Sequence, residues 1–309
     1  MNEIVEAVRG KRIAVLMGGP GSERLVSMAS GKGVLDALIS LGADAYAVDV
    51  KDDKFELRVG TDLAFNVIHG TYGEDGGVQA ELERRGVRYT GEGVEESRTA
   101  IDKIRSKECF VRHGVPTPGF EVIAAGVKPS MAVPLVLKAP KEGSSVGVYI
   151  VREAGELDAA LVEVARYSQT VLVEEFIEGR ELTVGVLGDD VLPVIEIRAR
   201  KDFYNFENKY PFLNPMAAGA DHLCPAPLSS EVEQHVKETA LKAHRALGLR
   251  VYSRVDLLLR DDGAVYVLEI NTIPGMTPSS LLPEAAREVG ISYAQLCRIV
   301  VELSLSRKP

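Results

Sequence analysis

Two consecutive segments alternate charged or amide side chains with apolar ones, as strands do. Arg254 and Asp256 alternate in YSRVDLLLR, and Glu269 and Asn271 alternate in VLEIN. Residues two apart in a strand point to the same face, and the intervening RDDGAV is a turn sequence that folds one strand back on the other. Asp256 is therefore predicted to lie near Glu269 and Asn271, with Arg254 beside them.

A cluster of this kind could bind a hard cation. Three oxygen-bearing side chains on one sheet face suit Mg²⁺, which takes few protein ligands and leaves positions for phosphate oxygens. The alternative is a solvated sheet face with ordinary salt bridges. The strongly apolar residues on either side of the pairs favour the metal site.

A second segment, KAPKEGSSVGV (138–148), has features of a phosphate-binding turn. Its Gly-Ser-Ser sequence lets backbone N–H groups approach phosphate oxygens, and Lys138 adds a positive charge. A flexible hairpin turn has a similar sequence. Two standard nucleotide motifs are excluded, because Arg24 replaces the third glycine in GGPGSER and Gly33 follows Lys32 in SGKGV.

The segment VEEFIEGRE (173–181) could bind a nucleoside. A purine needs an acceptor for its amino group and an apolar slot, and a ribose needs an acceptor for its hydroxyls. Glu174, Phe176, Ile177 and Glu181 could supply these groups. A surface acidic turn is an equally good interpretation of these residues alone.

Two further polar residues are predicted at the edge of a parallel sheet. His69 ends the apolar run LAFNVI, and Glu23 lies in the first turn of a predicted helix. Open α/β sheets bind ligands at the carboxyl ends of their strands, so both residues could contact a substrate. The alternative for Glu23 is that it complements the helix dipole.

The sequence predicts an α/β protein, because segments with strand and helix patterns alternate along the chain. Residues 12–91 resemble a Rossmann layer. A domain joint is predicted near residue 95. An irregular segment, 199–228, has the length and composition of a functional lid. The remaining predicted strands cover 133–140, 144–151, 170–177, 181–188, 191–198, 251–260 and 264–271, and the helices cover 22–41, 96–113, 153–167, 229–247, 281–289 and 292–305.

Composition narrows the class of protein. The chain has 309 residues, a net charge of -9, 46% hydrophobic residues and no long basic block, so nucleic acid and anionic membranes are not expected as partners. No apolar run approaches the roughly 20 residues of a membrane span, and the first residues do not have the pattern of a secretory signal. Three widely separated cysteines suit a reducing compartment. We expect a cytoplasmic protein.

Together, the motifs resemble those of the D-alanine–D-alanine ligase family of the ATP-grasp superfamily. The resemblance covers nearly the whole chain in order and rests on GGPGSERLVS, HGTYGEDG, YTGEGVEES, DKIRSK, KAPKEGSSVG, VEEFIEGRE, FYNFENKY, SRVDLLL and LEINTIPGMTPSSLLP. It implies an ATP-grasp fold of three domains. These are an N-terminal Rossmann-like substrate domain (1–94), a central ATP-grasp subdomain (95–179) and a C-terminal subdomain (180–309) with the metal site and the lid.

The resemblance also implies a role for each site residue. The ATP-binding residues are Lys103, Lys138, Glu174, Phe176, Ile177, Glu181 and Lys209, and the ligands of two Mg²⁺ or Mn²⁺ ions are Asp256, Glu269 and Asn271. The first D-alanine is bound by Glu23, with His69 nearby, and its reacting carboxyl group by Arg254 and the backbone of Gly275. Ser280 and Leu281 anchor the second D-alanine. Glu23, Ser144 and Tyr210 form a hydrogen-bonded latch that closes the lid.

The implied activity is the ATP-dependent joining of two D-alanines through an acyl phosphate, for peptidoglycan precursor synthesis, by a homodimer. Two alternatives remain. A related ligase could use D-lactate or D-serine as its second substrate, although Tyr210 argues against D-lactate because ester-forming relatives resemble a pattern with Phe there. A nucleotide-binding regulatory protein without turnover is disfavoured because Arg254, Asp256, Glu269 and Asn271 are all retained.

Overall fold

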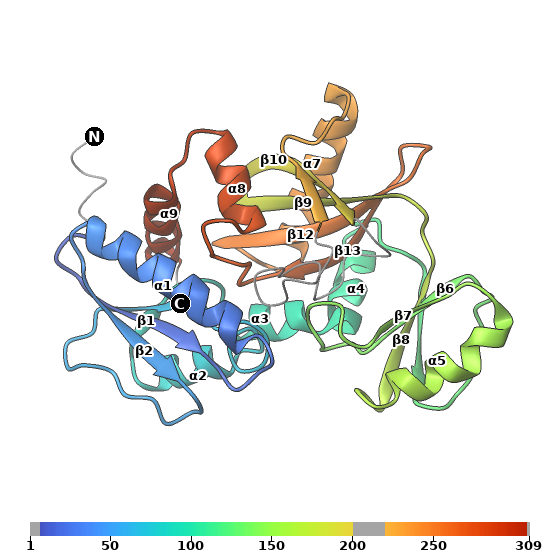
Figure 1. Cartoon of the computed structure of the whole chain (residues 1–309), viewed down its shortest axis with the longest axis horizontal. Helices are drawn as coiled ribbons and strands as arrows, with labels where there is room; N and C mark the ends of the chain where they lie inside the picture. The colour runs from blue at the N-terminus through green and yellow to red at the C-terminus, as the bar shows by residue number, and fades with distance from the viewer. Residues whose placement is uncertain (1–6, 200–219, 308–309) are drawn as a thin grey trace.

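The computed structural model describes residues 7–199 and 220–307, whose strands form three sheets (Figure 1). The first sheet is parallel and has the order β2-β1-β3-β4. Apolar β1 is buried along most of its length because helices cover both faces of this sheet, as the alternating pattern predicts. Its elements are β1 (Arg12–Gly18), α1 (Arg24–Ser40), β2 (Asp44–Val50), β3 (Leu63–Asn66), α2 (Gly77–Arg84) and β4 (Arg88–Tyr89).

The second sheet is antiparallel, in the order β5-β8-β6-β7. It consists of β5 (Phe120–Ala124), β6 (Leu135–Lys138), β7 (Val148–Val151) and β8 (Thr170–Glu175), with η2 (Ala154–Glu156) and α5 (Leu157–Val164) between β7 and β8. Helix α5 buries Leu161 and Val164 in the core of this layer. Strand β5 was not predicted, because it is short, follows two prolines and pairs with β8, which is distant in sequence.

The third sheet is antiparallel, in the order β11-β10-β9-β12-β13. Its elements are β9 (Arg180–Leu187), β10 (Asp190–Ala199), β11 (Ala220–Leu223), α7 (Ser230–Ala246), β12 (Tyr252–Leu259), β13 (Val265–Asn271) and α8 (Leu281–Glu288). The prediction of an irregular segment over 199–228 was wrong at 220–223, which pair with β10 as strand β11. Residues 200–219 lie outside the described residues, so the lid remains a prediction.

A pair of helices replaces the single helix predicted over 96–113. Helix α3 (Val94–Ile101) ends at Asp102, whose backbone is extended (φ -89°, ψ 100°), and α4 (Lys103–Arg112) begins immediately after it. The Asp102 carboxylate accepts hydrogen bonds from the backbone N–H groups of Ile104 and Arg105, so it caps α4. The break places Lys103 in the first turn of α4, beside the loop that follows β6, where its N–H donates to Pro140 O at 2.9 Å.

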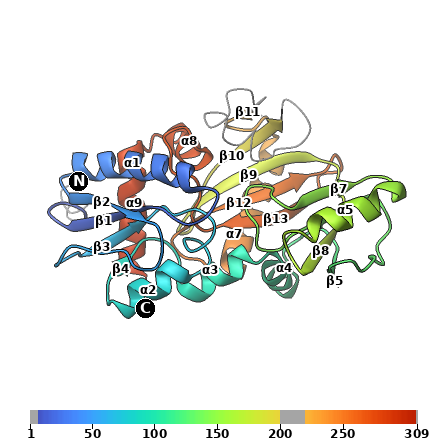
Figure 2. The same cartoon turned by 60° about the horizontal axis from the view of Figure 1, so that its bottom comes forward.

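The parallel sheet and the five-stranded sheet share one hydrophobic core. Helix α9 (Tyr293–Ser306) packs against α1, and Val300 and Leu282 join Ile13 and Val15 in the same buried cluster. Figure 2 shows the three sheets in a row along the molecule, with the five-stranded sheet in the middle. Among the described helices, none is by itself long and apolar enough to cross a bilayer; α8 and α9 reach that length and composition only as a pair, which bends by 104°.

Candidate active site

The predicted pairing of β12 with β13 is confirmed. Arg254 lies opposite Asn271 and Asp256 opposite Glu269, with an irregularity in the register just after Asp256. Because the strands are antiparallel and the pairs are two residues apart, all four side chains belong to one region of the sheet. The turn after Leu259 sets the register as far as Leu257 and Val267, and the irregularity then shifts it by one residue, which brings Asp256 opposite Glu269.

Asp256 is the most closely held of these residues. Its two carboxylate oxygens accept hydrogen bonds from Arg254 Nε and Nη2, both at 2.9 Å, and Asn271 Nδ2 donates to Oδ2 at 3.1 Å. The hydroxyl of Thr183, on the neighbouring strand β9, donates to Oδ1 at 2.6 Å. A carboxylate that is only 7% exposed would be costly to bury without such partners. The network therefore fixes the orientation of the Asp256 carboxylate.

Glu269 pairs with a lysine from another part of the chain. Its Oε2 lies 3.0 Å from Lys103 Nζ, which also donates to Glu142 O at 2.8 Å. Burial disfavours the charged form of Lys103, but the nearby carboxylate of Glu269 outweighs this effect, so the pKa of Lys103 is raised. Lys103 therefore stays cationic beside the acidic residues of β12 and β13.

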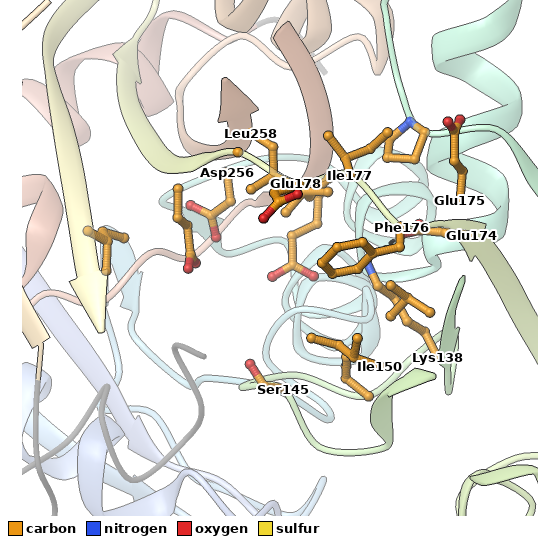
Figure 3. Close-up of a pocket in the computed structure, with 18 of the residues that line it drawn as sticks. Lys138, Ser145, Ile150, Glu174, Glu175, Phe176, Ile177, Glu178, Asp256 and Leu258 are labelled. Carbon is orange, nitrogen blue, oxygen red and sulfur yellow. Dashed lines mark ion pairs between the residues drawn. The ribbon is translucent and has the colours of Figure 1, made fainter. Parts of the chain in front are cut away.

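A cavity of about 560 Å³ separates the second sheet from the third. In Figure 3 the ring of Phe176 projects into it, between Asp256 and Leu258 on one side and Lys138 and Ile150 on the other. Its lining combines apolar side chains such as Val136, Ile150 and Leu268 with many charged ones of both signs, which suits a large charged ligand. The sequence-predicted residues that line it are Lys103, Lys138, Glu174, Phe176, Ile177, Glu181, Asp256 and Glu269.

Glu174 is buried in the wall of this cavity between two ammonium groups. Lys138 Nζ lies 2.6 Å from its Oε2, and Lys107 Nζ lies 2.9 Å from its Oε1. Burial raises the pKa of the carboxyl group, but the two lysines more than offset this, and the pKa of Glu174 is lowered overall. Glu174 is therefore an ionised acceptor in the wall of the cavity.

A smaller cavity of about 30 Å³ adjoins the first, and the two share Glu269 as a lining residue. The Oγ of Ser144 donates to Glu23 Oε1 at 2.5 Å, which joins the turn after β6 to the start of α1. Ser144 has φ 51° and Ser145 φ 63°, a left-handed conformation that is costly for residues other than glycine and is often found at functional sites. Other predicted residues that line this cavity are His69, Arg254, Asn271 and Gly275.

His69 is buried, and both of its ring nitrogens have partners. Nδ1 lies 3.1 Å from Ile273 O, to which it must donate, and Nε2 lies 3.1 Å from Ser30 Oγ. Glu74 Oε1 lies 3.6 Å from Nδ1. Desolvation disfavours the imidazolium, but Glu74 outweighs it, and the pKa of His69 is raised.

The last two predicted substrate residues lie at the start of α8. Ser280 Oγ accepts a hydrogen bond from Thr277 N at 3.1 Å, and a Cβ added to Gly275 would come within 2.9 Å of it. Ser280 therefore lies against the lining of the smaller cavity. The side chain of Leu281 packs in the hydrophobic core instead, so any contact with a substrate would use its backbone.

Several residues at this site were not predicted from the sequence, among them Glu74, Thr183 and Lys107. Glu74 lines the smaller cavity, and its position in HGTYGEDG, just beyond a strand, could have revealed it. Thr183 contacts Asp256, and Lys107 contacts Glu174. Each pair is brought together by the tertiary fold, so the spacing of these residues in the sequence gave no signal. Lys209 and Tyr210 lie outside the described residues. In the part of the chain that is described, no group of three His, Cys, Asp or Glu side chains is arranged to hold a metal ion.

A nucleotide-sized cavity between two antiparallel sheets, bordered by lysines and carboxylates, defines an ATP-grasp protein. Comparisons with known proteins agree. Residues 110–302 match the family model "D-ala D-ala ligase C-terminus". A D-alanine–D-alanine ligase of Methylacidiphilum infernorum is 44% identical over 297 residues, which cover 96% of each chain.

Solved structures extend this agreement to the whole fold. The D-alanine–D-alanine ligase of Bacillus anthracis matches with a TM-score of 0.84 and 33% identity over 96% of this chain and 98% of the other. Its complex with ATP matches with a TM-score of 0.81, 30% identity and the same coverage. The chain belongs to the D-alanine–D-alanine ligase family, and it is an enzyme of the ligase class. The predicted family and ATP-grasp fold are confirmed.

Proposed function

We propose that this enzyme joins two D-alanines to D-alanyl-D-alanine at the expense of ATP, through an acyl phosphate, as a step of peptidoglycan precursor synthesis in cell-wall formation. The observation that carries this proposal is that the two cavities share Glu269. A nucleotide in the larger cavity and an amino acid in the smaller one would meet there.

ATP would lie in the larger cavity, as it does in the solved complex of the Bacillus anthracis relative. Lys103 and Lys138 are placed to neutralise phosphate charge, together with Lys209, whose part stays a prediction. The Glu174 carboxylate would accept a hydrogen bond from the 6-amino group of adenine, with Phe176 and Ile177 beside the base. Glu181 would accept a hydrogen bond from a ribose hydroxyl. The ionised state of Glu174 supports this role, because an ionised carboxylate only accepts hydrogen bonds.

Asp256, Glu269 and Asn271 would hold two Mg²⁺ or Mn²⁺ ions. Their oxygen donors fit hard divalent cations, and they number few enough to leave room for phosphate oxygens. When bound, the ions would neutralise the charge that spreads over the transferring phosphoryl group.

The first D-alanine would bind in the smaller cavity, with its ammonium on Glu23 and His69 nearby. Its carboxylate oxygen attacks the γ-phosphorus and displaces ADP, which gives the acyl phosphate. Arg254 and the Gly275 N–H would then stabilise the oxyanion that forms when the second amine attacks the acyl carbon. Phosphate leaves, and the attacking nitrogen loses a proton. The Arg254 guanidinium is fixed by both oxygens of Asp256, so it is preorganised for this task.

The second D-alanine would be anchored by Ser280 and by the backbone of Leu281. Ser144 already contacts Glu23, and we propose that Tyr210 completes this latch over the substrates. A phenol there favours an amine over D-lactate as the second substrate. We also expect a homodimer that works in the cytoplasm and contributes to cell shape.

The test is product analysis after incubation with ATP, Mg²⁺ and a mixture of D-alanine, D-serine and D-lactate. We expect D-alanyl-D-alanine as the main product, with one ADP and one phosphate formed for each dipeptide. Release of phosphate that does not depend on D-alanine would contradict the proposal. A predominant ester or mixed dipeptide would show that the second substrate is D-lactate or D-serine.

A further inference from the structure

Lys107 is a buried cation that the proposed chemistry does not use. It lies on α4, its side chain is completely buried, and it is not among the described residues that line the large cavity. Its ammonium donates to Thr117 Oγ1 at 2.6 Å and Pro118 O at 3.2 Å, and it pairs with Glu174 at 2.9 Å. Lysine is among the residues least often buried completely, and it is buried only where it is paired. The place of Lys107 behind Glu174 therefore requires an explanation.

We propose that Lys107 is a specificity-determining residue that keeps Glu174 ionised, and thereby makes the site accept a 6-amino purine and reject a 6-oxo purine. This inference rests on the proposed function, in which Glu174 faces the base. An ionised carboxylate can accept a hydrogen bond from the amino group of adenine. It cannot donate one to the 6-oxo group of hypoxanthine or guanine, so two acceptors would face each other. Lys107 acts through Glu174 and does not touch the nucleotide.

The electrostatics around Glu174 support a separate role for Lys107. The charged groups that face this carboxylate are Lys107 and Lys103 from α4 and Lys138 from β6. Lys103 already pairs with Glu269, and Lys138 lines the cavity, where phosphate would compete for it. Lys107 is therefore the cation whose contact with Glu174 stays the same when a nucleotide binds. Desolvation lowers its own pKa to about 8, so it is charged at neutral pH.

Removal of the charge at position 107 should free Glu174 to take up a proton. Burial favours the neutral form of a carboxyl group, and one of its two close cations would be absent. A protonated Glu174 can donate to a 6-oxo group, so the preference for ATP over ITP should fall. ITP is the suitable probe because it differs from ATP in the 6-position and the adjoining N1 proton only.

The experiment measures kcat/KM for ATP and for ITP, in the D-alanine-dependent reaction, between pH 6 and 9. In the wild type the ratio should change little with pH. In Lys107→Met the ratio of kcat/KM for ATP to kcat/KM for ITP should fall by about tenfold or more. This is the factor that corresponds to one hydrogen bond to a charged group. The fall should be largest at the lowest pH and should arise from the KM of the nucleotide.

Matched variants complete the design. Lys107→Arg keeps the charge and should restore the wild-type ratio, and Lys128→Met makes the same change at an exposed lysine and should leave the ratio unaltered. Lys107→Gln, which keeps an N–H donor, gives a second neutral variant if Lys107→Met does not fold. Glu174→Gln, whose amide can donate to a 6-oxo group, should lower the ratio at every pH.

The outcomes separate this inference from the proposed function. If the wild type makes no dipeptide, the proposed function fails and the inference with it. If Glu174→Gln leaves the ratio unchanged, Glu174 does not recognise the base, so its proposed role and this inference are overturned, while the ligation of D-alanine stands. If Glu174→Gln lowers the ratio but neither neutral Lys107 variant does, or if their effect is the same at every pH, Lys107 is only a structural ion pair and the inference alone is overturned.

Discussion

Thr183→Val tests how Asp256 is held in the proposed metal site. The substitution replaces a hydroxyl by a methyl group of similar size, so packing around the side chain is nearly unchanged. Thr183 is 1% exposed, and its hydroxyl donates to Asp256 Oδ1 at 2.6 Å. Water therefore has little access to replace the lost donor. Arg254 and Asn271 remain in contact with the carboxylate.

The expected cost follows from this geometry. A buried hydrogen bond to a charged group contributes about 1.5–3 kcal/mol, so we expect a loss of this size in the free energy of unfolding. Residues that orient a metal ligand typically change metal affinity by roughly 10- to 100-fold when they are replaced. The Mg²⁺ concentration for half-maximal activity should rise by at least the lower factor.

The assay combines urea denaturation with a Mg²⁺ titration of D-alanine-dependent phosphate release. Thr183→Ser is the matched control, because it keeps the hydroxyl and should restore the Mg²⁺ requirement. If Thr183→Val has the stability and Mg²⁺ requirement of the wild type, the hydroxyl does not position Asp256, and the reasoning is refuted.

Three further predictions concern other contacts. Glu269→Gln removes the negative charge beside Lys103. Dipeptide synthesis at saturating Mg²⁺ should fall by on the order of 10²-fold, as expected when a group that stabilises transition-state charge is lost. Near-normal turnover would refute this. Ser144→Ala removes the bond to Glu23 and should raise the KM of D-alanine more than that of ATP, and equal changes in steady-state kinetics would count against it. Burial raises the pKa of Glu92 to about 7, so its stabilising contribution is complete below the ordinary pKa of about 4.5 and is lost as the pH rises through 7. Glu92→Gln should therefore be less sensitive to pH than the wild type in thermal unfolding at pH 5 and pH 8, and identical pH sensitivity would exclude this role.

Local sequence was sufficient where neighbouring elements are joined by a short turn. The turn between β12 and β13 makes the two strands neighbours, so the proximity of Asp256 and Glu269 was predictable, but the one-residue shift that places them opposite each other was not. The alternation of strands and helices likewise predicted the parallel sheet, because a strand followed by a helix returns to the same sheet.

Contacts between distant segments could not be predicted in the same way. Thr183 reaches Asp256 because β9 pairs with β12, an order that no spacing reveals, and Lys107 reaches Glu174 across the packing of α4 on the second sheet. The break at Asp102 was also missed, since a charged residue in a helical pattern resembles any exposed position. Its side chain instead caps α4 and places Lys103 beside Glu269.

The most direct test of the central claim is to follow oxygen from the substrate into phosphate. D-Alanine labelled with ¹⁸O in its carboxylate is incubated with ATP and Mg²⁺, and the released phosphate is analysed by mass spectrometry. If the carboxylate attacks the γ-phosphorus and the acyl phosphate is then cleaved by the second amine, each phosphate carries one ¹⁸O atom, and dipeptide forms in equal amount. Phosphate without label, formed together with dipeptide, would show that the carboxylate is not phosphorylated and would contradict the account.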